Sequence, residues 1–146
     1  MKNSDICFIR KCIIPVIDKL TRPIWNKWFY AWNGEKYDSC ERTMVCSTGT
    51  RSNPTPLGTY QAGGKCGGEW YYFKDFGCYA KYAYRIIGGI LFHSVLYNSK
   101  SNGSLVQGSV RALGSRASHG CVRLSVENAK WICDNCPAGT TVVVQN

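Results

Sequence analysis

The sequence predicts a mainly β protein that forms one domain, and three observations lead to this prediction. Its 146 residues are enough for one domain with a sizeable core. Short apolar, β-branched or aromatic runs recur along the chain, and 15 glycines and 5 prolines separate them with turns. A hydrophobic share of 45% with only 18% charged residues excludes an intrinsically disordered chain.

The expected strands follow one another along most of the chain. In order they cover residues 13–17, 27–32, 41–47, 59–62, 69–74, 83–87, 90–96 and 140–145. Asn33-Gly34 predicts a hairpin turn after the second strand, because these residues adopt the positive φ angles of tight hairpins. The mostly polar residues 98–109 predict a surface loop or lid-like insertion. One helix is expected at residues 126–135, with Ser125 as its N-cap and Glu127 in its first turn.

The chain is basic, with a formal net charge of +9. This excess favours a polyanionic or carboxylate-rich partner, such as nucleic acid, anionic lipid or an acidic cell-wall polymer. The basic residues are scattered and no nucleic-acid-binding motif is found, so nucleic acid is not the expected partner. The longest apolar run, residues 86–92, is too short for a membrane span. The charged Arg10 and Lys11 interrupt the apolar N-terminus, which therefore does not fit a secretory signal.

The nine cysteines are an odd number, which suggests either a paired framework with one free thiol or mostly free thiols. Cys66 with Cys78 and Cys40 with Cys46 are candidate disulfides, and buried reduced thiols are the alternative. The Cys133-x-x-Cys136 pair has no partner pair of ligands, so no metal site is expected.

The segment most informative about chemistry is Ser118-His119-Gly120-Cys121-Val122-Arg123. A thiolate nucleophile needs a base or an imidazolium that favours the anion, and the chain has only two histidines, His93 and His119. Gly120 lets the backbone approach a substrate, and the N–H groups of Gly120 and Cys121 are candidates for an oxyanion hole. Taken separately, His93 also fits a core histidine and Cys121 an inert buried thiol.

At these residues the sequence resembles the L,D-transpeptidase catalytic domain, the YkuD-like family. The resemblance rests on His93-Ser94 followed by the Ser-His-Gly-Cys motif, and it extends to segments 45–49, 55–60, 124–129 and 139–143. It covers residues 13–146, which leaves 1–12 as an N-terminal extension. The 28 positions from His93 to Cys121 exceed the family's commoner spacing, which places an insertion at residues 98–111.

The resemblance implies a single-domain β-sandwich of mixed sheets with one or two short helices. It also implies a two-step acyl transfer on peptidoglycan stem peptides, without a cofactor. Cys121 would be the nucleophile and His93 the base, with one ring nitrogen held by the Ser94 carbonyl. Gly120 and His119 would line the site. Arg123 and Ser118 would bind substrate, although a surface salt bridge is the alternative for Arg123.

The same resemblance implies that carbapenem-type inhibitors bind, that the protein is a monomer, and that it acts outside the membrane at the cell wall. The chain would then be part of a longer precursor. An L,D-carboxypeptidase or an enzyme that anchors proteins to the wall is an alternative on the same fold. An inactive wall-binding module is a third reading, which the presence of Cys121, His93 and His119 together disfavours.

Overall fold

The computed structural model describes residues 12–17, 26–32 and 37–145, with side chains from residue 42 onward except Thr43. In chain order the elements are β1 (Cys12–Ile17), β2 (Asn26–Trp32), β3 (Tyr37–Gly49), β4 (Gly58–Gln61), β5 (Gly64–Lys65), β6 (Trp70–Phe73), β7 (Cys78–Lys81), β8 (Tyr84–Ile87), β9 (Ile90–Ser94), β10 (Leu96–Tyr97), the 3-10 turn η1 (Asn102–Ser104), α1 (Gln107–Arg111), β11 (Arg116–Ser118), β12 (Val122–Leu124), α2 (Val126–Asn135) and β13 (Thr141–Gln145). None of the helices in this part of the chain is long and apolar enough to cross a membrane.

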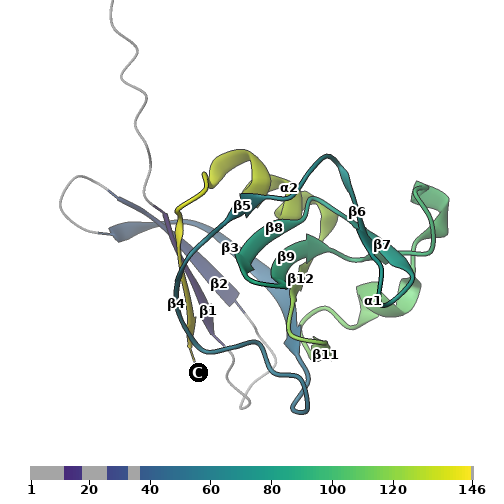
Figure 1. Ribbon diagram of the computed structural model, residues 1–146. Coiled ribbons are helices and arrows are strands. Elements are labelled where there is room, and N and C mark those ends of the chain that lie inside the picture. The colour runs from purple at the N-terminus through teal and green to yellow at the C-terminus, as the bar shows by residue number, and fades with distance from the viewer. Residues whose placement is uncertain (1–11, 18–25, 33–36, 146) are drawn as a thin grey trace, which may run out of the picture.

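Ten of the described strands form one mixed sheet. Its order is β4-β13-β1-β2-β3-β12-β9-β8-β5, and β11 pairs with β3 beside this path. Most neighbours are antiparallel, but β1 with β13, β12 with β9 and β11 with β3 are parallel. β4 also packs against β8 from the other half of the sheet, so the sheet curls around a common core. Figure 1 shows β8, β9 and β12 in the middle of the molecule, with β6, β7 and α1 on one side of them.

The core lies between the curled sheet and α2. Its members are apolar side chains that are at most 4% exposed: Met44, Cys46, Ala62, Tyr84, Ile86, Phe92, Val122, Leu124, Ala129, Ile132, Cys136, Val142 and Val144. α2 begins where predicted, because Ser125 Oγ accepts the N–H of Asn128 at 3.2 Å. α2 packs against both β9 and β12, so these two strands are part of the core packing.

The predicted mainly β fold of mixed sheets with few short helices is confirmed. Seven of the eight expected strands match one described strand each, and residues 90–96 divide into β9 and β10. The predicted turn at Asn33-Gly34 lies outside the described residues, although β2 and β3 pair antiparallel on either side of it. Sequence reasoning missed β5, β7, β11, β12 and α1, which are two to five residues long and too short to show a period.

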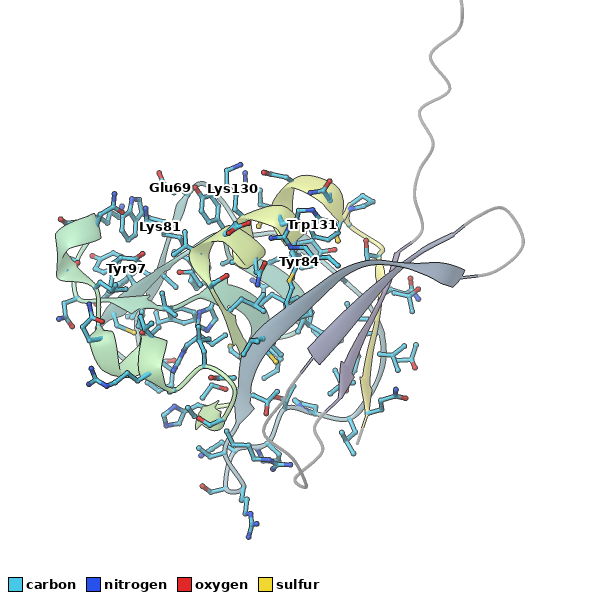
Figure 2. All side chains as sticks on the ribbon, turned by 180° about the vertical axis from the view of Figure 1, so that it is seen from behind. Glu69, Lys81, Tyr84, Tyr97, Lys130 and Trp131 are labelled. Atoms are coloured by element: carbon cyan, nitrogen blue, oxygen red, sulfur yellow. The ribbon has the colours of Figure 1, made fainter. Side chains whose placement is uncertain are left out.

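A smaller sheet of order β10-β7-β6 carries the insertion of residues 98–111. The link is Lys81, whose Nζ lies 2.7 Å from Glu69 Oε1 and 2.6 Å from Asn102 Oδ1. The same ammonium lies 4.5 Å from the ring centre of Trp70. Figure 2 labels Lys81, Glu69 and Tyr97 in this cluster. The insertion, predicted as a surface loop, is thus a partly helical segment fastened to the small sheet.

Both candidate disulfides are wrong. Cys66 and Cys78 are free thiols, because Cys66 lies beside Ala83 at the open end of the β6–β7 hairpin and Cys78 pairs with Phe73 at its turn end. Cys40 and Cys46 lie six residues apart on the single strand β3. Their Cα atoms are therefore about 20 Å apart, whereas a disulfide allows about 7 Å at most.

Candidate active site

The parallel pairing of β9 with β12 brings the two parts of the motif together. His93 on β9 is the register partner of Arg123 on β12, and Cys121 immediately precedes β12. His93, Cys121 and Arg123 all line one cavity of about 780 Å³. Ser118 and His119 line it as well, so the structure brings these predicted side chains to one place.

His93 is held in the orientation that a general base requires. Its side chain is 3% exposed, and Nδ1 lies 2.6 Å from the carbonyl oxygen of Ser94. A carbonyl oxygen only accepts, so Nδ1 carries the proton and Nε2 keeps its lone pair. The predicted contact with the Ser94 carbonyl is therefore present. Burial lowers the pKa of His93 from 6.5 to about 4, so the imidazole is neutral at pH 7.

Ser94 is itself fixed by the small sheet. Its Oγ accepts the backbone N–H of Lys81 at 2.8 Å and donates to the carbonyl oxygen of Val95 at 2.7 Å. The ring of Phe73 on β6 packs against the imidazole of His93, with 4.8 Å between ring centres. The orientation of His93 therefore depends on the packing of β6 and β7 against β9.

Cys121 is a partly buried thiol, and its surroundings contain groups that raise its pKa and groups that lower it. Burial raises its pKa, while the N–H of Leu91, 3.4 Å from Sγ, and the charge of Arg123 lower it. Burial is the largest of these effects, so the net shift is upward. The thiol also lies 3.6 Å from the carbonyl oxygen of Gly89. The resting pair is therefore a neutral thiol and a neutral imidazole.

Gly120 occupies a backbone position that other residues would strain. Its φ is +118°, and a Cβ there would lie 2.9 Å from Cδ1 of Ile90. Its carbonyl accepts from Thr55 Oγ1 at 2.8 Å, which ties the motif to the segment before β4. Its N–H donates to Ser118 Oγ at 3.2 Å, so this N–H is engaged within the loop and not directed at a substrate.

The same contact changes the interpretation of Ser118. Its hydroxyl accepts from Gly120 and donates to the carbonyl oxygen of Cys121, and the residue is 2% exposed. Ser118 therefore holds the loop around Cys121. This arrangement favours a positioning role over the predicted contact with substrate, and it leaves the N–H of Cys121 as the remaining member of the predicted oxyanion pair.

Arg123 is a buried cation, not the surface residue of the alternative reading. It is 8% exposed, and its Nε has no hydrogen-bond partner among the described residues. No ion pair is found for it in that part of the chain, where the only acidic groups that pair are Glu69, Glu127 and Asp134. Burial raises the pKa of both Cys121 and Cys78, and the charge of Arg123 partly opposes this rise. The cavity thus has a positive group that lacks a counter-ion, which suits a carboxylate.

His119 lies at the mouth of the cavity. It is exposed, and its ring stacks on that of Phe76 with 4.8 Å between ring centres. Phe76 belongs to the turn between β6 and β7 and is 56% exposed. The two rings form an aromatic rim beside Cys121.

Sequence reasoning missed three participants in this site: Thr55, Phe76 and Cys78. Thr55 lies in the 55–60 segment that the resemblance includes, so its position was a usable signal. Phe76 stands out only as an apolar residue among the turn residues 74–77. Cys78 gave no signal, because only the fold places it near Arg123. No three His, Cys, Asp or Glu side chains of the described ranges are grouped as metal ligands.

Known proteins are similar to this chain in sequence and in fold. A family model described as YkuD, the L,D-transpeptidase catalytic domain, matches residues 27–144. "Putative L,D-transpeptidase YciB" of Bacillus subtilis (strain 168) is 35% identical over 107 residues, which cover 70% of this chain and 54% of that protein. This chain therefore spans about half the length of that relative.

Solved structures of similar fold include two L,D-transpeptidases. LD transpeptidase LdtMt1, in complex with imipenem, has a TM-score of 0.69 and 26% identity over 92% of this chain and 59% of that chain. An L,D-transpeptidase from Mycobacterium smegmatis has a TM-score of 0.68 and 24% identity over 94% of this chain and 59% of that chain. Both confirm the fold described above.

Proposed function

This chain belongs to the L,D-transpeptidase catalytic domain family, and we propose that it is a peptidoglycan L,D-transpeptidase with Cys121 as nucleophile. Its acyl donor is a tetrapeptide stem, and its acceptor is the amine of the third residue of a neighbouring stem. The products are a 3-3 cross-link and free D-alanine. Residues 13–146 form the catalytic domain in this proposal, and residues 1–12 are an extension.

The observation that carries the proposal is the neutral pair of thiol and imidazole in one cavity. With Nδ1 of His93 held by the Ser94 carbonyl, Nε2 is the nitrogen that can take a proton. In the first step the Cys121 thiol gives its proton to Nε2 as the sulfur attacks the carbonyl carbon of the third stem residue. The N–H of Cys121 donates to the oxyanion. D-alanine then leaves with that proton on its amine, and a thioester remains on Cys121.

The second step reverses the roles of the same groups. The incoming amine loses a proton to Nε2 of His93 and attacks the thioester carbonyl. The new amide forms, the sulfur leaves, and His93 returns the proton to it. Arg123 attracts the carboxylate of the stem, because a buried guanidinium without a counter-ion gains most from an anion. His119 and Phe76 bound the entrance through which the acceptor arrives.

The charge of the protein supports a cell-wall substrate. A net charge of +9 attracts an anionic polymer, and the proposed reaction takes place outside the membrane, so we place the enzyme there. LdtMt1 was solved with imipenem, and imipenem is therefore the probe that we expect to acylate Cys121. The proposed active unit is a monomer.

Incubation with a disaccharide-tetrapeptide, followed by mass spectrometry, tests the proposal. A cross-linked dimer with release of D-alanine is the expected result. Tripeptide alone would mean an L,D-carboxypeptidase, and a product joined to an added protein amine would mean an anchoring enzyme. Unchanged substrate would reject all three activities and favour a wall-binding module.

A matched pair of cysteine variants identifies the nucleophile. Cys121→Ala should abolish turnover and the imipenem adduct, whereas Cys133→Ala should keep most of both, because Cys133 lies outside the cavity. Turnover at the wild-type rate in Cys121→Ala, or an adduct mapped to another cysteine, would end the proposal.

A further inference from the structure

Two other cysteines lie close together outside the cavity of Cys121. Cys66 follows β5 at the edge of the large sheet, and Cys133 lies in the last turn of α2. Both are free thiols of intermediate exposure, and neither lines the catalytic cavity. The proposed acyl transfer gives them no role.

Both residues contact the same backbone carbonyl oxygen, that of Ala83. The N–H of Cys66 donates to the carbonyl oxygen of Ala83 at 2.8 Å, and the Cys133 thiol lies 3.8 Å from that oxygen. The Cys66 nitrogen and the Cys133 sulfur are therefore less than about 7 Å apart, so the two cysteines are close neighbours, and bridged cysteines have Cα atoms about 4.4–6.8 Å apart. Burial is the main cause that raises the pKa of the Cys133 thiol, and the Cys66 thiol adds to the rise, which is consistent with neighbouring sulfurs.

The backbones that carry the two cysteines are fixed. β5 pairs with β8 through Lys65 and Tyr84, and the Tyr84 hydroxyl donates to the carbonyl oxygen of Pro137 at 2.9 Å, just beyond α2. Ile132, the neighbour of Cys133, is fully buried. Figure 2 labels Tyr84 beside Trp131, which belongs to α2. The two thiols make only weak contacts that a disulfide would replace: Cys66 Sγ lies 3.7 Å from the Gly64 carbonyl oxygen and Cys133 Sγ 3.8 Å from that of Ala83.

We propose that Cys66 and Cys133 form a disulfide that staples the end of α2 to the β5 edge of the sheet. The oxidant is a small-molecule disulfide, such as oxidised glutathione. One protein thiolate attacks it and expels one reduced thiolate, and the second protein thiolate then attacks the mixed disulfide and expels the other. The two protein thiols lose two protons and two electrons, and the oxidant is reduced to two thiols.

The staple closes a loop from residue 66 to residue 133, which contains β6 to β12 and therefore the whole cavity. A long closed loop restricts the unfolded chain strongly, so the oxidised protein is the more stable form. The bond leaves Cys121 untouched, because neither partner faces the cavity.

The experiment oxidises the full chain carrying Cys121→Ala with oxidised glutathione at pH 8.5, which keeps the catalytic thiol out of the reaction. The expected mass loss is about 2 Da, and trypsin should release peptide 66–74 joined to peptide 131–146. The melting temperature should rise by about 8–15 °C and return to its reduced value with dithiothreitol.

Two variants decide which thiols react. Cys66→Ser and Cys133→Ser should each lose the linked peptide and the rise in melting temperature, whereas Cys78→Ser should keep both. Cys136→Ser should also keep both, which separates Cys133 from its neighbour in the same peptide. A link from Cys133 to Cys136, a link from Cys66 to Cys78, or no mass loss after exhaustive oxidation would overturn the proposal.

Discussion

Acylation of Cys121 should change little between pH 5.5 and pH 7.5. Burial lowers the pKa of His93 to about 4, and only the neutral imidazole can accept a proton. At pH 5.5 about 97% of the imidazole is then neutral, and at pH 7.5 nearly all of it is. A histidine with the ordinary pKa would be about 9% neutral at the lower pH and about 90% at the higher, a tenfold change. The raised pKa of Cys121 keeps that group a thiol across the range.

Intact-protein mass spectrometry after timed mixing with imipenem measures this rate. We expect rate constants at pH 5.5, 6.5 and 7.5 within a factor of two of one another, and the same flat profile in His119→Ala. His93→Ala should lose a factor of about 10² to 10⁴, the usual contribution of general-base assistance. A tenfold fall with a midpoint near pH 6.5 would refute the neutral, buried base. If His119→Ala lost the rate and His93→Ala kept it, the two histidines would have exchanged roles.

Three further predictions follow from the same geometry. The unfolded chain protonates His93 below pH 6.5, whereas the folded chain does so only below about pH 4. The free energy of unfolding should therefore fall by up to about 3 kcal/mol as the pH drops from 6.5 to 4. Urea titrations should show this fall in the wild type and not in His93→Gln. Gly120→Ala should lower imipenem acylation at least about tenfold and cost about 1–3 kcal/mol of stability by thermal denaturation, because its Cβ meets Ile90. Gly68→Ala, where the space is open, is the matched control and should change neither. Arg123→Met should raise the melting temperature while it lowers turnover, since it removes a buried charge without a partner; a fall in both would mean that Arg123 stabilises the fold.

Much of the fold could be predicted from the sequence, because the long strands and α2 carry their own local signals. The β-branched runs of β1 and β13 and the N-cap Ser125 are of this kind. β5, β11 and β12 have only two or three residues, and their strand character comes from the neighbours with which they pair. The local sequence does not show with which strands these short segments will pair.

In the candidate site, too, some features could be predicted from local sequence and others depend on the fold. Cys121 and His93 were predicted from residue type and motif, and the contact between His93 and the Ser94 carbonyl was implied by the resemblance. The hydrogen bond from the Gly120 N–H to Ser118 Oγ was not predicted, because it depends on the direction of the Ser118 hydroxyl in the folded loop. The disulfides failed for a related reason. Spacing along the chain says little about distance when a whole hairpin separates two residues, as with Cys66 and Cys78.

The contact between Nδ1 of His93 and the carbonyl oxygen of Ser94 limits which substitutions can remove it. Every amino acid contributes a carbonyl oxygen, so no substitution at position 94 can delete the acceptor that fixes the imidazole. A side-chain carboxylate in that place would be open to loss by one nucleotide change. This contact can be lost only if the main chain moves, for instance after a change near the Lys81 N–H that holds Ser94 Oγ. The acceptor of this contact is a main-chain carbonyl oxygen, so substitution of a side chain cannot delete it.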